Sequence, residues 1–187
     1  MGIDLKKYDK ARNRSVVTNR IPGYRFWIPI ASFMGTGYAP RASGTVGSFV
    51  TFFLLFMIGL KWPDFASGIP YIVACLLIIP IGAIASDKGR KMWGDDASRI
   101  VIDETAGMMW SVLFFGFSPF AFIGLFFLFR FFDIFKLPPG RQIDKNIHSG
   151  WGILLDDIIA GIYANLTMRL VIFTLTYIGC CERLVSR

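Results

Sequence analysis

Five apolar segments dominate the sequence and constrain its fold more than any other feature. A helix that crosses a bilayer needs about 20 apolar residues, and only the third and fifth segments approach this length cleanly. With 54% hydrophobic residues among 187 and a mean hydropathy of +0.53, the chain is too apolar for a soluble domain of its size. We therefore predict an all-α fold, a compact integral-membrane helical bundle. The segments cover roughly residues 24–39, 46–60, 69–86, 106–129 and 152–179.

Turn signals inside the apolar regions predict short helical hairpins. Gly116–Pro119 interrupts the fourth segment, and proline disfavours helix in the residue before it. A straight crossing there would place Asp103 and Asp133 on opposite sides of the membrane. A second turn, Lys61–Asp64, joins the second and third segments. Both hairpins bring the polar motifs to one face, which the positions of Lys and Arg predict to be cytoplasmic.

A basic segment precedes what we expect to be a single domain. Seven of the twenty basic residues come before Phe26, so we expect residues 1–25 to be cytoplasmic and residues 26–187 to form one membrane-embedded domain. The basic segment lacks the apolar core of a signal peptide. Contact with anionic membrane lipids explains its charge better than nucleic acid, because it lacks the interleaved aromatic residues on which bases stack. The first apolar segment, broken by Pro29 and two glycines, is expected to be interfacial or re-entrant.

The three cysteines give neither a disulfide framework nor zinc-ligand spacing. A reducing compartment is compatible with them. The spacing from Cys181 to Arg187 matches the C-x5-R loop of cysteine phosphatases. The residues between lack glycine and add a carboxylate, whereas a phosphate cradle needs converging backbone N–H groups. We interpret this stretch as a solvated tail.

Eight of the thirteen acidic residues lie between positions 95 and 157, in pairs or clusters beside apolar runs. An ionised side chain in hydrocarbon costs about 2.5–3.5 kcal/mol on insertion scales, so a shared divalent cation is an economical partner. Adjacent carboxylates such as Asp103 and Glu104 project about 100° apart on a helix and can approach a hard ion from two directions. A helix N-terminal charge pair is the alternative, but it does not explain several acidic sites. The predicted metal ligands are Asp103, Glu104, Asp133, Asp156 and Asp157.

Basic side chains near these carboxylates are candidates for binding phosphate. Asp133 lies three residues from both Arg130 and Lys136, a spacing that also fits a simple ion-pair ladder. Lys136 is better placed for function, because it opens a Pro-Pro-Gly break where an ammonium could meet phosphate. For the pair Asp156–Asp157, water-facing charges at a helix start are the alternative to metal binding.

Polar residues in two loops or helix starts complete the predicted substrate site. Thr45 and Ser48 belong to a Gly-Thr-Val-Gly-Ser stretch that could present hydroxyls and backbone N–H groups to phosphate. Such glycines more often serve close helix packing. Asp144 and His148 are also candidates, although residues of these types often only cap or hydrogen-bond a loop.

The polar residues form ordered motifs: G-T-x-G-S from Gly44, I-V-x-D-E-x-x-G from Ile100 and F-R-x-x-D-x-x-K from Phe129, then D-x-N-x-H from Asp144 and D-D-x-x-A-G from Asp156. In this order they resemble the phosphatidylglycerophosphatase A family over roughly residues 32–165. The resemblance implies a magnesium-dependent lipid phosphatase of the bacterial cytoplasmic membrane, which converts phosphatidylglycerol phosphate to phosphatidylglycerol and phosphate. Two positions depart from the family pattern: a K-P-x-P motif is Lys-Leu-Pro-Pro here, and Ser43 replaces a proline.

Metal-assisted attack by water is the mechanism that the residues favour, with Mg²⁺ as the predicted cofactor. One rival is a CDP-alcohol phosphotransferase, whose D-x-x-D-G-x-x-A-R pattern is absent. Another is a non-enzymatic membrane cation carrier or assembly factor. The predicted catalytic set is Asp103, Glu104, Asp133, Lys136, Asp156 and Asp157, and the predicted substrate-binding set is Thr45, Ser48, Arg130, Lys136, Asp144 and His148.

Overall fold

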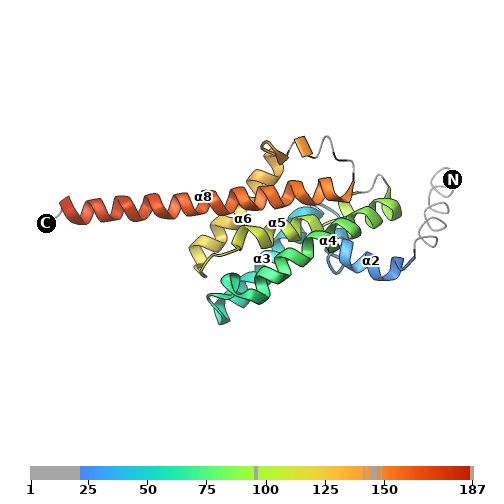
Figure 1. Ribbon diagram of the computed structural model, residues 1–187, viewed down its shortest axis with the longest axis horizontal. Helices are drawn as coiled ribbons and strands as arrows, with labels where there is room; N and C mark the ends of the chain where they lie inside the picture. Colours follow the sequence, from blue (N-terminus) through green and yellow to red (C-terminus); the bar gives the residue numbers. More distant parts are fainter. Residues whose placement is uncertain (1–21, 95–96, 141, 144–146, 148, 186–187) are drawn as a thin grey trace, which may run out of the picture.

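The computed structural model describes residues 22–94, 97–140, 142–143, 147 and 149–185. All of the regular structure in these ranges is helical, which confirms the predicted fold class (Figure 1). One-turn 3-10 helices η1 (Thr36–Tyr38), η2 (Phe65–Ser67) and η3 (Ala97–Arg99) separate some of the α-helices. The α-helices are α2 (Tyr24–Ala31), α3 (Ser43–Lys61), α4 (Ile69–Trp93), α5 (Ile102–Val112), α6 (Pro119–Phe135) and α8 (Gly150–Val185).

Three of these helices are long and apolar enough to cross a membrane: α3, α4 and the Gly150–Gly179 part of α8. Large apolar side chains remain exposed on all three, among them Phe53, Leu76 and Phe173. Lipid solvates such side chains, so their exposure suits a membrane-associated bundle. Helix α3 is longer than its apolar run, because the small residues that begin its glycine motif already adopt helical conformation.

Both predicted hairpins are present. Residues 62–68 turn the chain from α3 into α4, and residues 113–118 separate α5 from α6. The two turns lie together: the Phe117 N–H donates to the Pro63 carbonyl at 2.8 Å, and the Phe114 N–H donates to the Ala66 carbonyl at 3.0 Å. With 11 residues, α5 is only about 16 Å long, so it ends within the bundle rather than crossing a bilayer.

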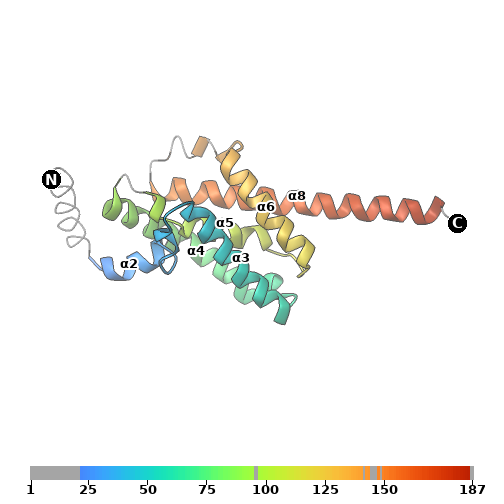
Figure 2. The ribbon, with the colours of Figure 1, turned by 180° about the vertical axis from the view of Figure 1, so that it is seen from behind.

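Helix α5 occupies the centre of the bundle and packs against α3, α4, α6 and α8. The core around it contains Met108 and Val112 of α5, with Phe122, Leu125 and Phe129 of α6, all of them fully buried. Seen from behind, the C-terminal part of α8 extends beyond the other helices (Figure 2). The first turn of α5 and the N-terminal part of α8, which carry the site, therefore lie in the well-packed part of the molecule.

Helix α2 has eight residues and is too short to cross a membrane. It packs on α4, and the Ala31 carbonyl accepts a hydrogen bond from the Val101 N–H at 2.9 Å, which ties it to the start of α5. Its predicted interfacial position stays a prediction. Most of the predicted basic segment, residues 1–21, lies outside the described residues, so the division at residue 25 also stays a prediction.

Candidate functional site

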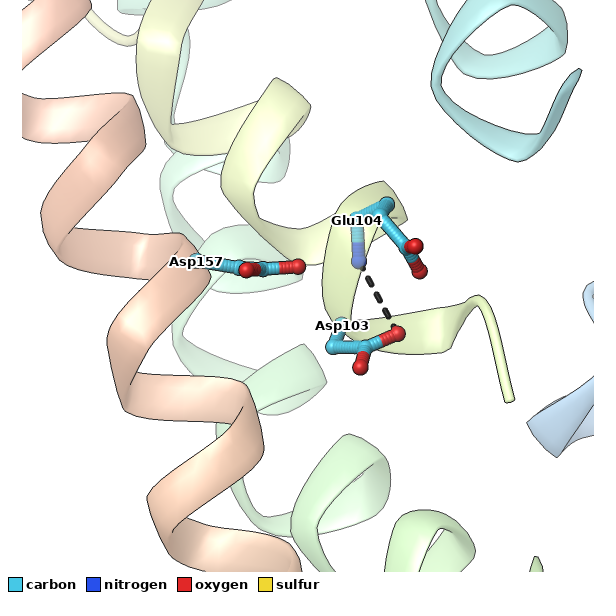
Figure 3. A group of neighbouring side chains, drawn as sticks. All are labelled: Asp103, Glu104 and Asp157. Atoms are coloured by element: carbon cyan, nitrogen blue, oxygen red, sulfur yellow. Dashed lines mark hydrogen bonds between the residues drawn. The ribbon is translucent and has the colours of Figure 1, made fainter. Parts of the chain in front are cut away.

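Three carboxylates from two helices meet inside the bundle. Asp103 and Glu104 lie in the first turn of α5, and Asp157 projects toward them from α8 (Figure 3). One oxygen of each side chain lies within 4.8 Å of the others. Asp103 and Asp157 are buried and Glu104 is half-buried. The Glu104 N–H donates to Asp103 Oδ1 at 3.1 Å, which fixes the rotamer of that carboxylate.

Two glycines allow α5 and α8 to approach closely enough to form this cluster. A Cβ atom on Gly161 would lie 2.2 Å from the Gly107 carbonyl oxygen, and a Cβ on Gly107 would lie 2.5 Å from the Asp157 carbonyl oxygen. Gly161 follows Asp157 by four residues, as Gly107 follows Asp103, so each glycine shares a helix face with its carboxylate. The structure thus shows close helix packing at Gly161.

Glu104 carries a buried carboxylate oxygen, Oε2, without a compensating hydrogen-bond partner among the described residues. Burial raises its pKa well above the ordinary 4.5, and the charges of Asp103, Asp157 and Asp133 raise the pKa further. Burial also raises the pKa of Asp103. Such a group of oxygen donors fits a hard divalent cation, whose charge would offset the desolvation and mutual repulsion of the carboxylates.

Helix α3 reaches the same cluster through its first glycine. A Cβ on Gly44 would lie 2.0 Å from Glu104 Oε1, so only glycine leaves room for this carboxylate. The motif that begins at Gly44 therefore approaches the acidic cluster directly. The sequence indicated a role in close packing or in phosphate binding, and the structure shows the close approach.

Arg130 of α6 joins three of the predicted residues. Its guanidinium forms a 2.6 Å ion pair with Asp133 and donates to Ser48 Oγ at 3.1 Å and to Thr45 Oγ1 at 3.2 Å. The local ion pair expected from the three-residue spacing is thus present. The hydrogen bonds from Arg130 to α3 were not expected from that local spacing, because they join residues more than 80 positions apart. Asp133 acts electrostatically on the acidic cluster but is not one of the three carboxylates that meet there.

Asp156 lies beside the acidic cluster but faces another partner. Its Oδ2 atom lies 2.7 Å from Lys136 Nζ, at the end of α6. A Cβ on Gly140 would lie 2.5 Å from Asp156 Oδ1, so this glycine, which follows the Pro-Pro pair, also rests on the carboxylate. The sequence signalled neither Gly140 nor Gly107 as a site residue. The spacing of four residues from Asp103 to Gly107, repeated from Asp157 to Gly161, was the available signal for Gly107.

Some of the predicted features lie outside the described residues. They are Asp144 and His148, together with the side chains of residues 180–187.

The fold and the site together define a class of protein: a helical membrane-associated bundle whose buried carboxylates suit a cation and whose adjoining arginine and lysine suit a phosphate group. Residues 29–172 match the family model described as Phosphatidylglycerophosphatase A. The chain therefore belongs to the phosphatidylglycerophosphatase A family, as the resemblance in sequence implied.

Curated relatives agree with this assignment. The chain is 31% identical over 154 residues to phosphatidylglycerophosphatase A of Escherichia coli (strain K12), covering 81% of this chain and 86% of the relative. It is 29% identical over 155 residues to the protein of the same name from Haemophilus influenzae, covering 79% and 87%. A relative from Bacteroides thetaiotaomicron, named "Putative phosphatidylinositol-3-phosphatase", is 32% identical over 145 residues and covers 72% and 86%. No solved structure matches this chain.

Membership of this family favours a lipid phosphatase, a phosphoric monoester hydrolase, over the three rivals: a cation carrier, an assembly factor and a CDP-alcohol phosphotransferase.

Proposed function

We propose that this chain hydrolyses phosphatidylglycerol phosphate to phosphatidylglycerol and phosphate in the bacterial cytoplasmic membrane. The observation that carries the proposal is the meeting of Asp103, Glu104 and Asp157 beside Arg130, in a chain of this family. The lipid tails would stay in the bilayer, and only the terminal phosphate would reach the polar end of the bundle.

The distribution of basic residues supports a site that faces the cytoplasm. Lys88, Arg90 and Lys91 lie in the last turns of α4, at the end of the bundle where α5 begins. Lys61 lies at the other end of the bundle, in the last turn of α3 before the hairpin. By the positive-inside rule, the end with more Lys and Arg faces the cytoplasm.

The cofactor in this proposal is Mg²⁺, held by Asp103, Glu104 and Asp157, with Asp133 as a further candidate ligand. These are hard oxygen donors, and the buried Glu104 Oε2 atom, which has no hydrogen-bond partner in the described part of the chain, can accept one more interaction. When bound, such an ion polarises a phosphomonoester and lowers the pKa of a coordinated water. The protein itself contributes the position, the burial and the charge of the carboxylates.

Arg130, Thr45 and Ser48 would bind and orient the terminal phosphate. The planar guanidinium presents several N–H donors in a fixed fork that matches phosphate oxygens. Asp133 holds this fork from one side, and the two hydroxyls of α3 hold it from another. Arg130 thus stays in place before the substrate arrives, and Lys136 adds a second positive charge to offset the charge that develops during hydrolysis.

The headgroup could also differ, because the Bacteroides relative carries the name of a phosphatidylinositol-3-phosphatase. Phosphatidylinositol 3-phosphate is therefore the second candidate substrate. Both lipids present a phosphomonoester on a polar headgroup, and the same carboxylate cluster would serve either reaction.

The test is phosphate release in detergent micelles from each of the two lipids, with Mg²⁺ or with excess chelator. Wild type is compared with Asp103→Asn and with Asp64→Asn, a matched control in the turn at the far end of α3. We expect Mg²⁺-dependent phosphate release that is faster with phosphatidylglycerol phosphate. Asp103→Asn should lower the rate of release about 100-fold, and Asp64→Asn should leave it unchanged. Folded wild-type protein that releases no phosphate from either lipid would refute the proposal.

A further inference from the structure

Asp156 and Asp157 are neighbours in sequence, yet their side chains meet different parts of the protein. Asp157 faces α5 and lies in the carboxylate cluster with Asp103 and Glu104. Asp156 instead reaches Lys136, with 2.7 Å between Oδ2 and Nζ. Consecutive helical residues project about 100° apart, so the two carboxylates of this pair cannot share one orientation.

The backbone conformation at Lys136 is one that needs support. This residue ends α6 with a φ of 47°, in the left-handed region that residues other than glycine rarely adopt. Such a conformation persists only where the surroundings hold it. The side chain of Asp156 is 5% exposed, and that of Lys136 is 38% exposed. The lysine therefore reaches from a partly open position down to a buried carboxylate.

Helix α8 holds the loop after Lys136 at two further points. Gly140 rests against Asp156, since a Cβ there would lie 2.5 Å from Oδ1. The Tyr163 hydroxyl donates to the Pro138 carbonyl at 2.5 Å. Asp156 and Tyr163 are seven residues apart, about two turns, so both lie on one face of α8. This face supports the loop, and the face that carries Asp157 supports the cluster.

We propose that Asp156 is a positioning residue rather than a metal ligand: it holds the Lys136 ammonium at the edge of the carboxylate cluster, where the terminal phosphate of the lipid binds. The inference rests on the proposed function. An ammonium has three N–H donors, so it can keep its bond to Asp156 while it donates to a phosphate oxygen. Tyr163 is a second positioning residue, which acts through the Pro138 carbonyl.

The experiment separates metal binding from phosphate binding in the purified full-length protein. Thermal unfolding is measured in detergent alone, with Mg²⁺, and with Mg²⁺ plus inorganic phosphate. Asp157→Asn should lose the Mg²⁺-induced rise in Tm. Asp156→Asn should keep that rise, lose the additional rise from phosphate, and show a KM for the lipid about tenfold higher, the effect of one lost charge-assisted hydrogen bond.

Lys136→Met is the second variant, and it should behave as Asp156→Asn does. The double variant should be no worse than Lys136→Met alone, because the two residues act as one unit. Loss of the Mg²⁺-induced rise in Asp156→Asn would overturn the proposal, since Asp156 would then be a metal ligand. An unchanged phosphate response in Lys136→Met would also overturn it. Wild-type protein that responds to Mg²⁺ but releases no phosphate would refute the proposed function alone.

Discussion

Gly161 of α8 lies directly against Gly107 of α5: a Cβ on Gly161 would come within 2.2 Å of the Gly107 carbonyl oxygen. This contact is one helical turn from the carboxylates of Asp157 and Asp103. Since a side chain on either glycine would push the helices apart, the separation of α5 from α8 and the geometry of the acidic cluster depend on the same contact.

Replacing Gly161 with valine should therefore weaken both folding and metal binding. Overpacking of a close contact costs about 1–3 kcal/mol, so we expect a lower Tm and a higher Mg²⁺ concentration for half-maximal phosphate release. Gly179→Val is the matched control on the same helix, because a Cβ there meets nothing within 4 Å. Equal Mg²⁺ dependence in the two variants would contradict the role of the glycine contact.

Gly44→Ala tests the approach of α3 to the cluster. The new Cβ would lie 2.0 Å from Glu104 Oε1, so the carboxylate must move. We expect the Mg²⁺ concentration for half-maximal activity to rise about tenfold, the loss found when the groups that orient metal ligands are disturbed. Gly116→Ala is the control, since a Cβ there is 3.9 Å from its nearest neighbour. If Gly44→Ala titrates with Mg²⁺ like wild type, Glu104 has no part in holding the ion.

The sequence predicted the hairpins because their turns have local signals: proline and glycine act within a few residues of where they occur. It could not predict that Asp156 would contact Lys136 of α6 while Asp157 faces the carboxylates of α5. This difference depends on the rotation of α8 against α5 and α6, which is determined by the packing of the whole bundle. The contact of Arg130 with Thr45 was also beyond local reasoning, because it joins residues 85 positions apart.

Arg169 stabilises the turn that follows the end of α5. The carbonyls at the end of a helix and in the turn after it lack intrahelical partners. The Arg169 guanidinium donates to the Phe114 carbonyl at 2.8 Å and lies 4.6 Å from the centre of the Phe115 ring. Asn165 donates to the Leu113 carbonyl at 2.8 Å. Arg169→Leu should destabilise the protein by about 1–3 kcal/mol, because it removes the charge-assisted hydrogen bond to the Phe114 carbonyl.

Thermal unfolding in detergent measures this loss. Lys61→Leu is the control, since the ammonium of Lys61 also lies over an aromatic ring, 4.6 Å from the centre of the Trp62 ring. Lys61 is exposed at the end of α3. We expect a clearly smaller change in Tm for the control. A similar change in both variants would assign the effect to the loss of charge rather than to the end of α5.

The pH dependence of stability should reverse when Mg²⁺ is added. Burial and the neighbouring Asp103, Asp157 and Asp133 charges raise the pKa of Glu104 well above 4.5. Between that ordinary pKa and the raised one, the metal-free folded protein binds more protons than the unfolded chain, so its stability falls as pH rises. Metal binding requires the deprotonated carboxylates, so the stabilisation by Mg²⁺ grows with pH in the same window.

Thermal unfolding from about pH 5 to about pH 8, with and without Mg²⁺, measures both slopes, since each depends on protons bound at the cluster. Glu104→Gln removes one titrating group and should flatten the metal-free slope, and Asp64→Asn in the exposed turn should leave it unchanged. A Mg²⁺-induced rise in Tm that is equal at all pH values would mean that the ion does not compete with protons, and that it binds away from Asp103, Glu104 and Asp157.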